Sequence, residues 1–280
     1  MDGVAGGMSD QTSDQRMPTR KSRLRPPGPR PHRVLKLFSR LLAFWDAFRR
    51  PILVAIIAIS LAGLLASLSP HTRRALFTGF FEQRSLVLLL LGFNLITLSL
   101  LWSSGQRLDT SIYLMFNLRG YHPLWLDRVM WAFTQLGNGF VGLLLAASFY
   151  YLDQRRLAVE LLLGILTLWL AVEIIKAIIE RTRPFITLET SRVIGWRERG
   201  KSFPSGHSSQ AFFMVTLLAH HFNTGPLLSA VLYGLAVVVG FTRIYVGAHY
   251  PRDVIGGAIL GSVWGLMTSL IEAYLMTGQF

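Results

Sequence analysis

The segment KSFPSGHSSQAFFMVTLLAHHF, residues Lys201–Phe222, changes from polar to apolar character at His207. Hydroxyl groups, a glycine and an imidazole stand directly before a run of large apolar side chains. Ser205 is a favourable N-cap residue, so the pattern predicts a helix that begins next to it and continues into an apolar environment. Strongly hydrogen-bonding residues at the N-terminus of such a helix indicate either a simple helix cap or a binding site.

The composition indicates that this environment is a membrane. Only 15% of the 280 residues are charged, whereas soluble domains carry about 25%. We count about seven apolar segments, and a helix needs roughly 20 residues to cross a bilayer. The segments are Pro51–Ser69, Ser85–Ser103, Val129–Leu152, Leu157–Ile179, Ser208–Phe222, Pro226–Phe241 and Val254–Met276. The expected fold is all-α, a polytopic transmembrane helix bundle with a six-helix core and an extra N-terminal span. Because the chain has no cysteine, disulfides and thiolate metal sites are excluded.

The N-terminal part of the chain differs from the rest in its charge. The net charge is +13, and residues 1–50 hold 11 Lys and Arg against 4 Asp. Residues 1–33 are rich in Pro, Ser and Arg, and we predict a disordered basic tail there. Residues 34–83 are predicted to hold an interfacial helix at Val34–Arg50 and then the extra span. Residues 84–280 form the expected membrane-embedded core. A cytoplasmic tail that obeys the positive-inside rule is favoured over nucleic-acid binding.

Three polar clusters interrupt the apolar sequence, and such clusters near membrane spans are functional candidates because burying them is costly. We name them island 1 (Lys176–Pro184), island 2 (Phe203–His207) and island 3 (Thr242–Asp253). If the spans alternate in direction, all three islands lie on the same side of the membrane.

Island 2 has the features of an anion site. A helix that starts there directs unpaired N–H groups and the positive end of its dipole outward. Gly206 lets a ligand approach the backbone closely, and His207 can give a proton to a leaving oxygen. The alternative interpretation is an ordinary capped helix with an interfacial histidine.

Island 3 can orient a nucleophile. Pro251 is favoured in the first turn of a helix, which places His249 just before that helix and Asp253 inside its first turn. The carboxylate can then hold one imidazole nitrogen and leave the other free and basic. Arg243 stands six residues before His249 and adds positive charge. The alternative is a loop salt bridge between Arg252 and Asp253.

Island 1 supplies further positive charge. Lys176 and Arg183 are seven residues apart, about two helical turns, so both lie on one face if the helix continues to Pro184. Two cations directed at one point suit a phosphoryl group, whose oxygens gather charge in the transition state. The alternative is snorkelling at a helix end, with Glu173 or Glu180 as ordinary partners.

Together the islands resemble the signature of the type 2 phosphatidic acid phosphatase family of integral-membrane lipid phosphatases. Its first part, a lysine, six residues and Arg-Pro, is matched from Lys176 to Pro184. Its second part, Pro-Ser-Gly-His, is matched at residues 204–207. Its third part is Ser-Arg, five residues, His, three residues and Asp. The chain matches it from Thr242 to Asp253, with threonine in place of the usual serine. The resemblance covers roughly residues 100–276.

This resemblance implies a chemistry for the islands. His249 would attack phosphorus and form a phosphohistidine, oriented by Asp253, while His207 would protonate the leaving group. The phosphate-binding residues would be Lys176, Arg183, Ser205, Gly206 and Arg243. No metal or other cofactor is expected. The expected partners are the bilayer and a membrane lipid phosphate or diphosphate. Candidates are undecaprenyl diphosphate, phosphatidylglycerophosphate, phosphatidate and the 1-phosphate of lipid A.

Two other functions stay open at this point. A phosphotransferase would pass the phosphoryl group from the phosphohistidine to another lipid or a sugar instead of water. A non-enzymatic lipid-binding or transport bundle would make His249 dispensable.

We expect the protein in the bacterial inner (plasma) membrane, with the side of the site open. Seven spans with the basic tail inside place the islands in the cytoplasm, whereas bacterial relatives commonly present this site on the outer face.

Two further patterns carry predictions. Gly257, Gly261 and Gly265 form a GxxxGxxxG ridge that predicts close helix packing. The segment Asp109–Gly139 is predicted to be a loop leading into a helix, with Trp125 and Trp131 as interfacial aromatics, and a lipid entrance there is a hypothesis.

Overall fold

The computed structural model describes residues 51–52, 54–119 and 121–277. The predicted basic tail and the interfacial helix at Val34–Arg50 lie outside the described residues. Within the described ranges the chain forms helices and loops and contains no strand, which confirms the predicted all-α class. The helices are Val54–Ser67, α2 (Pro70–Glu82), α3 (Arg84–Ser99), α4 (Ser103–Asn117), α5 (Leu124–Gln135), α6 (Gly139–Tyr151), α7 (Arg155–Ile179), α8 (Pro184–Thr187), α9 (Gly206–His221), α10 (Pro226–Tyr245) and α11 (Pro251–Thr277).

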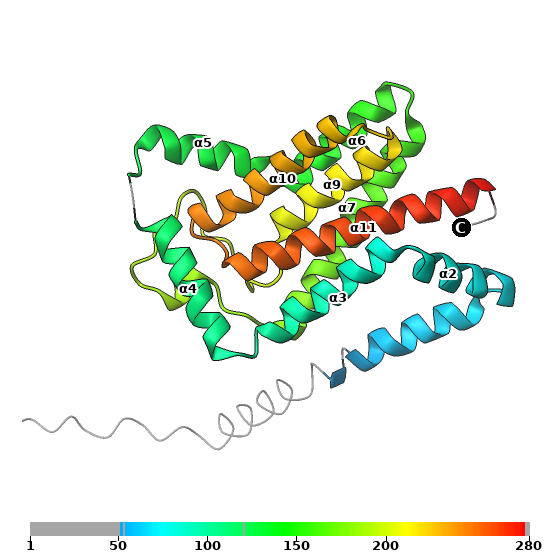
Figure 1. Ribbon diagram of the computed structural model, residues 1–280, viewed down its shortest axis with the longest axis horizontal. Coiled ribbons are helices and arrows are strands. Elements are labelled where there is room, and N and C mark those ends of the chain that lie inside the picture. The colour runs from blue at the N-terminus through cyan, green and yellow to red at the C-terminus, as the bar shows by residue number, and fades with distance from the viewer. Residues whose placement is uncertain (1–50, 53, 120, 278–280) are drawn as a thin grey trace, which may run out of the picture. The chain divides into compact units, whose positions relative to one another are not determined.

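Helix α9, which follows island 2, is the central helix of the described bundle. It contacts α6, α7, α10 and α11, and Figure 1 shows it running alongside α7, α10 and α11. Its Phe213 and Leu217 pack against Leu161 and Leu168 of α7 in a fully buried apolar cluster. Because α9 is surrounded on its sides, its N-terminus is held firmly at one end of the bundle.

The glycine ridge of α11 packs directly against the backbone of α9, as the sequence predicts. A Cβ atom at Gly257 would lie 2.5 Å from the Ser205 carbonyl oxygen, and one at Gly265 would lie 2.7 Å from Thr216 Cβ. A Cβ at Gly261 would overlap the Ser209 carbonyl oxygen. Only glycine therefore allows this approach, which brings the first residues of α9 and α11 together.

Three helical segments of the described chain are long and apolar enough to cross a membrane on their own: Arg155–Thr187, Pro226–Tyr245 and Pro251–Leu275. Two bent pairs raise the number to five if each pair is one span, against the seven predicted. The other two predicted spans correspond to shorter helices, the apolar helix Val54–Ser67 and the 16-residue α9.

The predicted continuous span Val129–Leu152 is broken into α5 and α6, which meet at an angle of 55°. Gly137 lies so close to the His207 carbonyl that a Cβ would be 2.5 Å from its oxygen. Asn138 then caps α6 by accepting a hydrogen bond from the Phe140 N–H at 3.0 Å. The predicted loop from Asp109 is likewise wrong in part, because α4 continues through that residue to Asn117.

The outward faces of the helices are apolar. Large exposed side chains lie on α3, α7 and α10, and include Leu88, Leu95, Leu163, Trp169 and Val237. A water-soluble protein rarely exposes so continuous an apolar surface, whereas lipid tails favour it. The chain is an integral membrane protein.

Candidate functional site

The three islands meet at one end of the bundle. Island 1 follows α7, island 2 begins α9, and island 3 joins α10 to α11. Contacts between their side chains link residues more than 60 positions apart in the sequence, such as Arg183 with His249. The three islands thus lie together, as their predicted position on one side of the membrane requires.

His249 lies in the α10–α11 connection with only 1% of its surface exposed. Its Nε2 is 3.2 Å from Arg183 Nη1. A guanidinium has donors and no acceptor, so Nε2 must present its lone pair. The ring proton then belongs on Nδ1, which lies 3.7 Å from Asp253 Oδ2 and 3.5 Å from Ser202 Oγ. In this tautomer Nε2 carries a lone pair and no proton.

Asp253 is fully buried in the first turn of α11, two residues after Pro251, as predicted. Its Oδ2 accepts hydrogen bonds from the Tyr250 N–H at 2.9 Å and from Ser202 Oγ at 2.5 Å. Its Oδ1 accepts one from Arg181 Nη1 at 2.6 Å. The carboxylate is thus fixed on both sides, and it fixes the Nδ1 edge of the His249 ring.

A buried ion network supports this carboxylate from behind. Arg181 also donates to Asp109 of α4 through Nη2, at 2.5 Å. Asp109 accepts from Arg252 Nε at 2.7 Å and from the Arg252 N–H at 3.1 Å. The alternative interpretation of a salt bridge between Arg252 and Asp253 is therefore wrong, since each residue has another partner. Sequence reasoning missed this role of Arg181 and Asp109, because spacing alone does not bring α4 to island 1.

The helix preceding island 1 ends earlier than predicted. α7 stops at Ile179, and Glu180 takes a left-handed conformation with φ 54°. Pro184 does not end this helix but begins the short α8, with Arg183 as its N-cap. Lys176 and Arg183 therefore do not share one helix face. The Lys176 ammonium lies 2.8 Å from Glu173 Oε1, which is the ordinary partnership considered above.

The two arginines of the site are held by backbone and hydroxyl groups. Arg183 is buried and donates to the carbonyl oxygens of Ala248 at 3.2 Å and Gly200 at 3.3 Å. Arg243, in the last turn of α10, donates through Nη1 to Thr134 Oγ1 of α5 at 2.8 Å. Both guanidinium groups are thereby oriented toward the same carboxylate, which belongs to Glu198.

Island 2 forms the predicted N-terminus of α9. Ser205 is the N-cap, and its Oγ accepts from the Ser208 N–H at 3.4 Å. The nearest atom to a Cβ at Gly206 would be 3.9 Å away, so neighbouring protein atoms do not require glycine there. His207 Nδ1 lies 3.8 Å from Glu198 Oε1. The Thr242 hydroxyl of island 3 instead bonds the Val239 carbonyl in its own helix, at 2.6 Å.

Glu198 lies in the loop between α8 and α9 and was missed by sequence reasoning. Burial by itself raises the pKa of its carboxyl, but the adjacent His249 imidazole and the Arg243 guanidinium lower it more strongly. The pKa of Glu198 therefore lies well below its ordinary value, and the group is a carboxylate. Its only sequence signal is an acidic residue within the basic stretch Arg197–Lys201.

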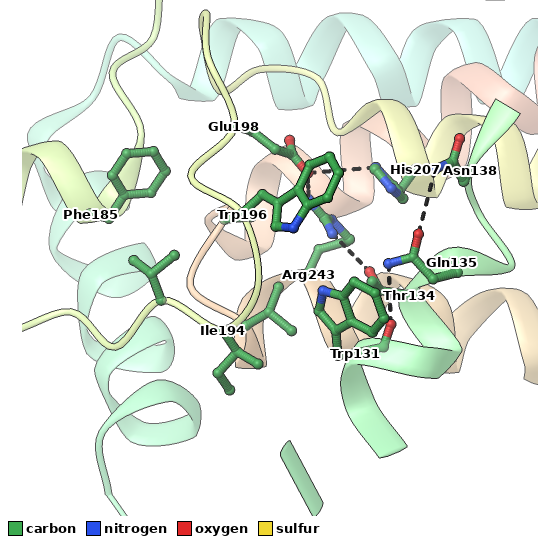
Figure 2. A pocket seen from close by; sticks show the side chains of 13 residues that line it. Trp131, Thr134, Gln135, Asn138, Phe185, Ile194, Trp196, Glu198, His207 and Arg243 are labelled. Carbon is green, nitrogen blue, oxygen red and sulfur yellow. Dashed lines mark hydrogen bonds and ion pairs between the residues drawn. The ribbon is translucent and has the colours of Figure 1, made fainter. Parts of the chain in front are cut away.

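A cavity of about 320 Å³ opens beside these groups. Its polar end holds Glu198, His207 and Arg243, while Trp131, Trp196 and other apolar side chains form much of the remaining wall (Figure 2). Trp131 was predicted as an interfacial aromatic near a lipid entrance. It does line the cavity next to the site, whereas Trp125 is 64% exposed.

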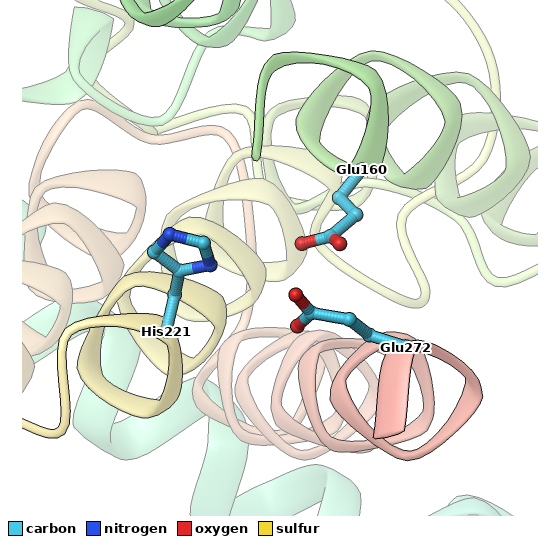
Figure 3. Close-up of side chains that lie close together, drawn as sticks. All are labelled: Glu160, His221 and Glu272. Carbon is cyan, nitrogen blue, oxygen red and sulfur yellow. The ribbon is translucent and has the colours of Figure 1, made fainter. Parts of the chain in front are cut away.

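Among the described residues, one group has a spacing that a metal ion could use. Ligand atoms of Glu160, His221 and Glu272 lie within 4.8 Å of one another. Figure 3 shows these three side chains gathered together. They belong to the beginning of α7, the end of α9 and the end region of α11. These are the opposite helix ends from His207 and His249, so this group is not part of the site formed by the islands.

Comparisons with known proteins agree with this geometry. The model of the PAP2 superfamily matches residues 157–276. Phosphatidylglycerophosphatase B of Bacillus subtilis is 31% identical over 150 residues, which cover 49% of this chain and 70% of the relative. Lipid A 1-phosphatase of Rhizobium etli is 40% identical over 75 residues, and the chain spans only 30% of that relative.

A similar solved structure supports the same assignment. The crystal structure of a transmembrane PAP2-type phosphatidylglycerolphosphate phosphatase from Bacillus subtilis matches with a TM-score of 0.59 and 27% identity. The match covers 68% of this chain and 97% of that one. With its family model, its relatives and its fold in agreement, this chain belongs to the PAP2 superfamily.

Proposed function

We propose that this protein is a membrane phosphatase that hydrolyses a lipid phosphate or diphosphate through a phosphohistidine intermediate. One observation carries the proposal: His249 presents its Nε2 lone pair toward Arg183, while its Nδ1 faces the buried Asp253. A buried imidazole held in this tautomer, beside two arginines, is suited to attack a phosphoryl group.

In the first step, His249 Nε2 forms a bond to phosphorus as the bond from phosphorus to the lipid oxygen breaks. Arg183 and Arg243 hold the phosphoryl oxygens, and His207 gives its proton to the leaving oxygen. Lys176, Ser205 and the Gly206 N–H are further proposed phosphate contacts. Asp253 balances the positive charge that His249 acquires.

In the second step, water attacks the phosphohistidine and gives its proton to His207. The bond from Nε2 to phosphorus breaks, inorganic phosphate is released, and both histidines return to their starting states. No metal or other cofactor is part of the proposed reaction.

The adjoining cavity supports a lipid substrate, because its wall is mainly apolar and aromatic. The relatives' names point to different lipids, phosphatidylglycerophosphate in one case and lipid A in the other. We therefore propose the substrate class and keep undecaprenyl diphosphate and phosphatidate among its members. We place the protein in the bacterial inner membrane.

The test is phosphate release from a panel of lipid mono- and diphosphates by the purified chain, with EDTA present. Release should persist in EDTA, vanish in His249→Ala and remain in His220→Ala, an exposed histidine at the other end of α9. Brief incubation with labelled substrate should also trap an acid-labile, alkali-stable phosphoprotein. Equal release by His249→Ala would refute the proposal, and label recovered in a second lipid would indicate a phosphotransferase.

A further inference from the structure

The pocket proposed to bind phosphate already holds a carboxylate of the chain itself. Glu198 Oε2 lies 2.9 Å from Arg183 Nη1 and 3.8 Å from His249 Nε2. Its Oε1 contacts Arg243 Nη2 and lies 3.8 Å from His207 Nδ1. These four side chains are the ones proposed to hold, attack and release a phosphoryl group. The Glu198 carboxylate therefore stands where phosphate oxygens would bind.

Glu198 also separates the cavity from the nucleophile. The cavity wall includes Glu198, His207 and Arg243, whereas Arg183 and His249 contact the other carboxylate oxygen and are each 1% exposed. A phosphoryl group that enters through the cavity can reach His249 Nε2 only after this carboxylate has moved. The carboxylate is 29% exposed, so its side chain can turn away from the two arginines toward the cavity.

We propose that Glu198 is an internal anion that competes with phosphate for Arg183 and Arg243 and so promotes release of the product. This inference rests on the proposed function. A tethered carboxylate acts at a high effective concentration, so a free anion with pocket contacts alone competes poorly with it. A lipid phosphate gains additional contacts in the apolar cavity and displaces it. Glu198 thus weakens the binding of inorganic phosphate in the pocket and assists release of the product.

The expected effect on phosphate affinity follows from the fraction of time that Glu198 spends outside the pocket when no phosphate is present. If that open conformation is populated about a tenth of the time or less, Glu198 weakens the apparent affinity for phosphate by at least about tenfold, relative to a chain without this carboxylate. Glu198→Gln removes the charge and keeps the shape, so it should bind inorganic phosphate at least about tenfold more tightly.

The experiment is equilibrium dialysis of labelled inorganic phosphate against the purified chain in detergent. Glu189→Gln is the matched control, since Glu189 is exposed in the same α8–α9 connection. Tighter binding by Glu198→Gln, with Glu189→Gln equal to the parent, supports the proposal. Equal or weaker binding by Glu198→Gln overturns it, because a residue that only supports the fold would weaken the pocket when changed.

Glu198→Asp gives a second test if the glutamine variant does not fold. Its side chain is one methylene shorter and cannot reach Arg183 and Arg243 together, so phosphate should again bind more tightly than in the parent. Unchanged or weaker binding would count against the proposal. The dialysis needs no turnover, so its result is separate from the His249→Ala assay, which alone decides whether the protein is a phosphatase.

Discussion

Replacing Asp253 by asparagine tests whether the carboxylate behind His249 sets which nitrogen of the proposed nucleophile carries the proton. Every described partner of this carboxylate is a donor or can act as one. Arg181 donates to Oδ1, while the Ser202 hydroxyl, the Tyr250 N–H and the Nδ1 edge of His249 face Oδ2. An amide group cannot satisfy both sides, because its –NH2 must point toward one of them.

The two orientations of the amide have different consequences. If –NH2 faces Arg181, a buried charge-assisted bond is lost, which costs about 1.5–3 kcal/mol of stability. If –NH2 faces His249, the imidazole must accept at Nδ1 and move its proton to Nε2. The nucleophilic lone pair then disappears, and loss of the correct tautomer in a comparable His–Asp pair lowers kcat by about 10⁴-fold. We expect the second orientation, since Arg181 requires an acceptor.

Asp109→Asn is the matched control for this change. It removes a buried carboxylate from the same Arg181 network but has no contact with His249 among those described. Both variants should lower the midpoint of thermal unfolding, whereas only Asp253→Asn should lower kcat for phosphate release by about 10⁴-fold. A kcat of Asp253→Asn within tenfold of the parent, or an equal loss in Asp109→Asn, would refute the reasoning.

Three further predictions concern packing, the cavity and pH. Gly261→Ala should destabilise the protein by about 1–3 kcal/mol in a thermal melt, because its Cβ meets the Ser209 carbonyl. Gly234→Ala, in a helix with open space around it, should instead be neutral or stabilising by up to about 1 kcal/mol; similar losses in both would contradict the packing account. Trp131→Ala should raise KM for a long-chain lipid phosphate more than for a short-chain one, and equal changes would exclude its contact with the lipid. The pKa of Glu198 is lowered, so its competition is present above that pKa and is lost only as the pH falls through it, below the ordinary value of 4.5. The ratio of phosphate affinities between Glu198→Gln and the parent should therefore be constant from about pH 9 to about pH 5, and a ratio that collapses near neutral pH would contradict this.

The sequence predicted those parts of the site that depend on local geometry. Ser205 is an N-cap by its chemistry, Pro251 begins a helix because its φ is fixed, and Asp253 follows from that start. The glycine ridge of α11 predicted close packing for a steric reason that does not depend on the partner helix. The all-α class followed from composition, because a bilayer leaves the backbone few other choices.

The remainder depended on tertiary contacts that no spacing encodes. Glu198 enters the pocket from an irregular loop, and Asp109 reaches Arg181 from a helix more than 60 residues away. The break of α7 at Glu180 is set by a single left-handed residue that carries no glycine signal. Composition also does not reveal where an apolar segment is interrupted, as between α5 and α6.

The close packing of the α11 glycines against the α9 backbone has a consequence for the evolution of such a protein. His207 and the segment that carries His249 are positioned by α9 and α11, two helices whose separation is set by glycines. Most of the large apolar side chains of the cavity wall come instead from α5, α8 and the α8–α9 connection. Mutation can therefore reshape the part that meets the tail of a lipid while the reacting groups keep their distance. Related proteins with this architecture can therefore differ in the lipid that they bind while they keep the same reacting residues.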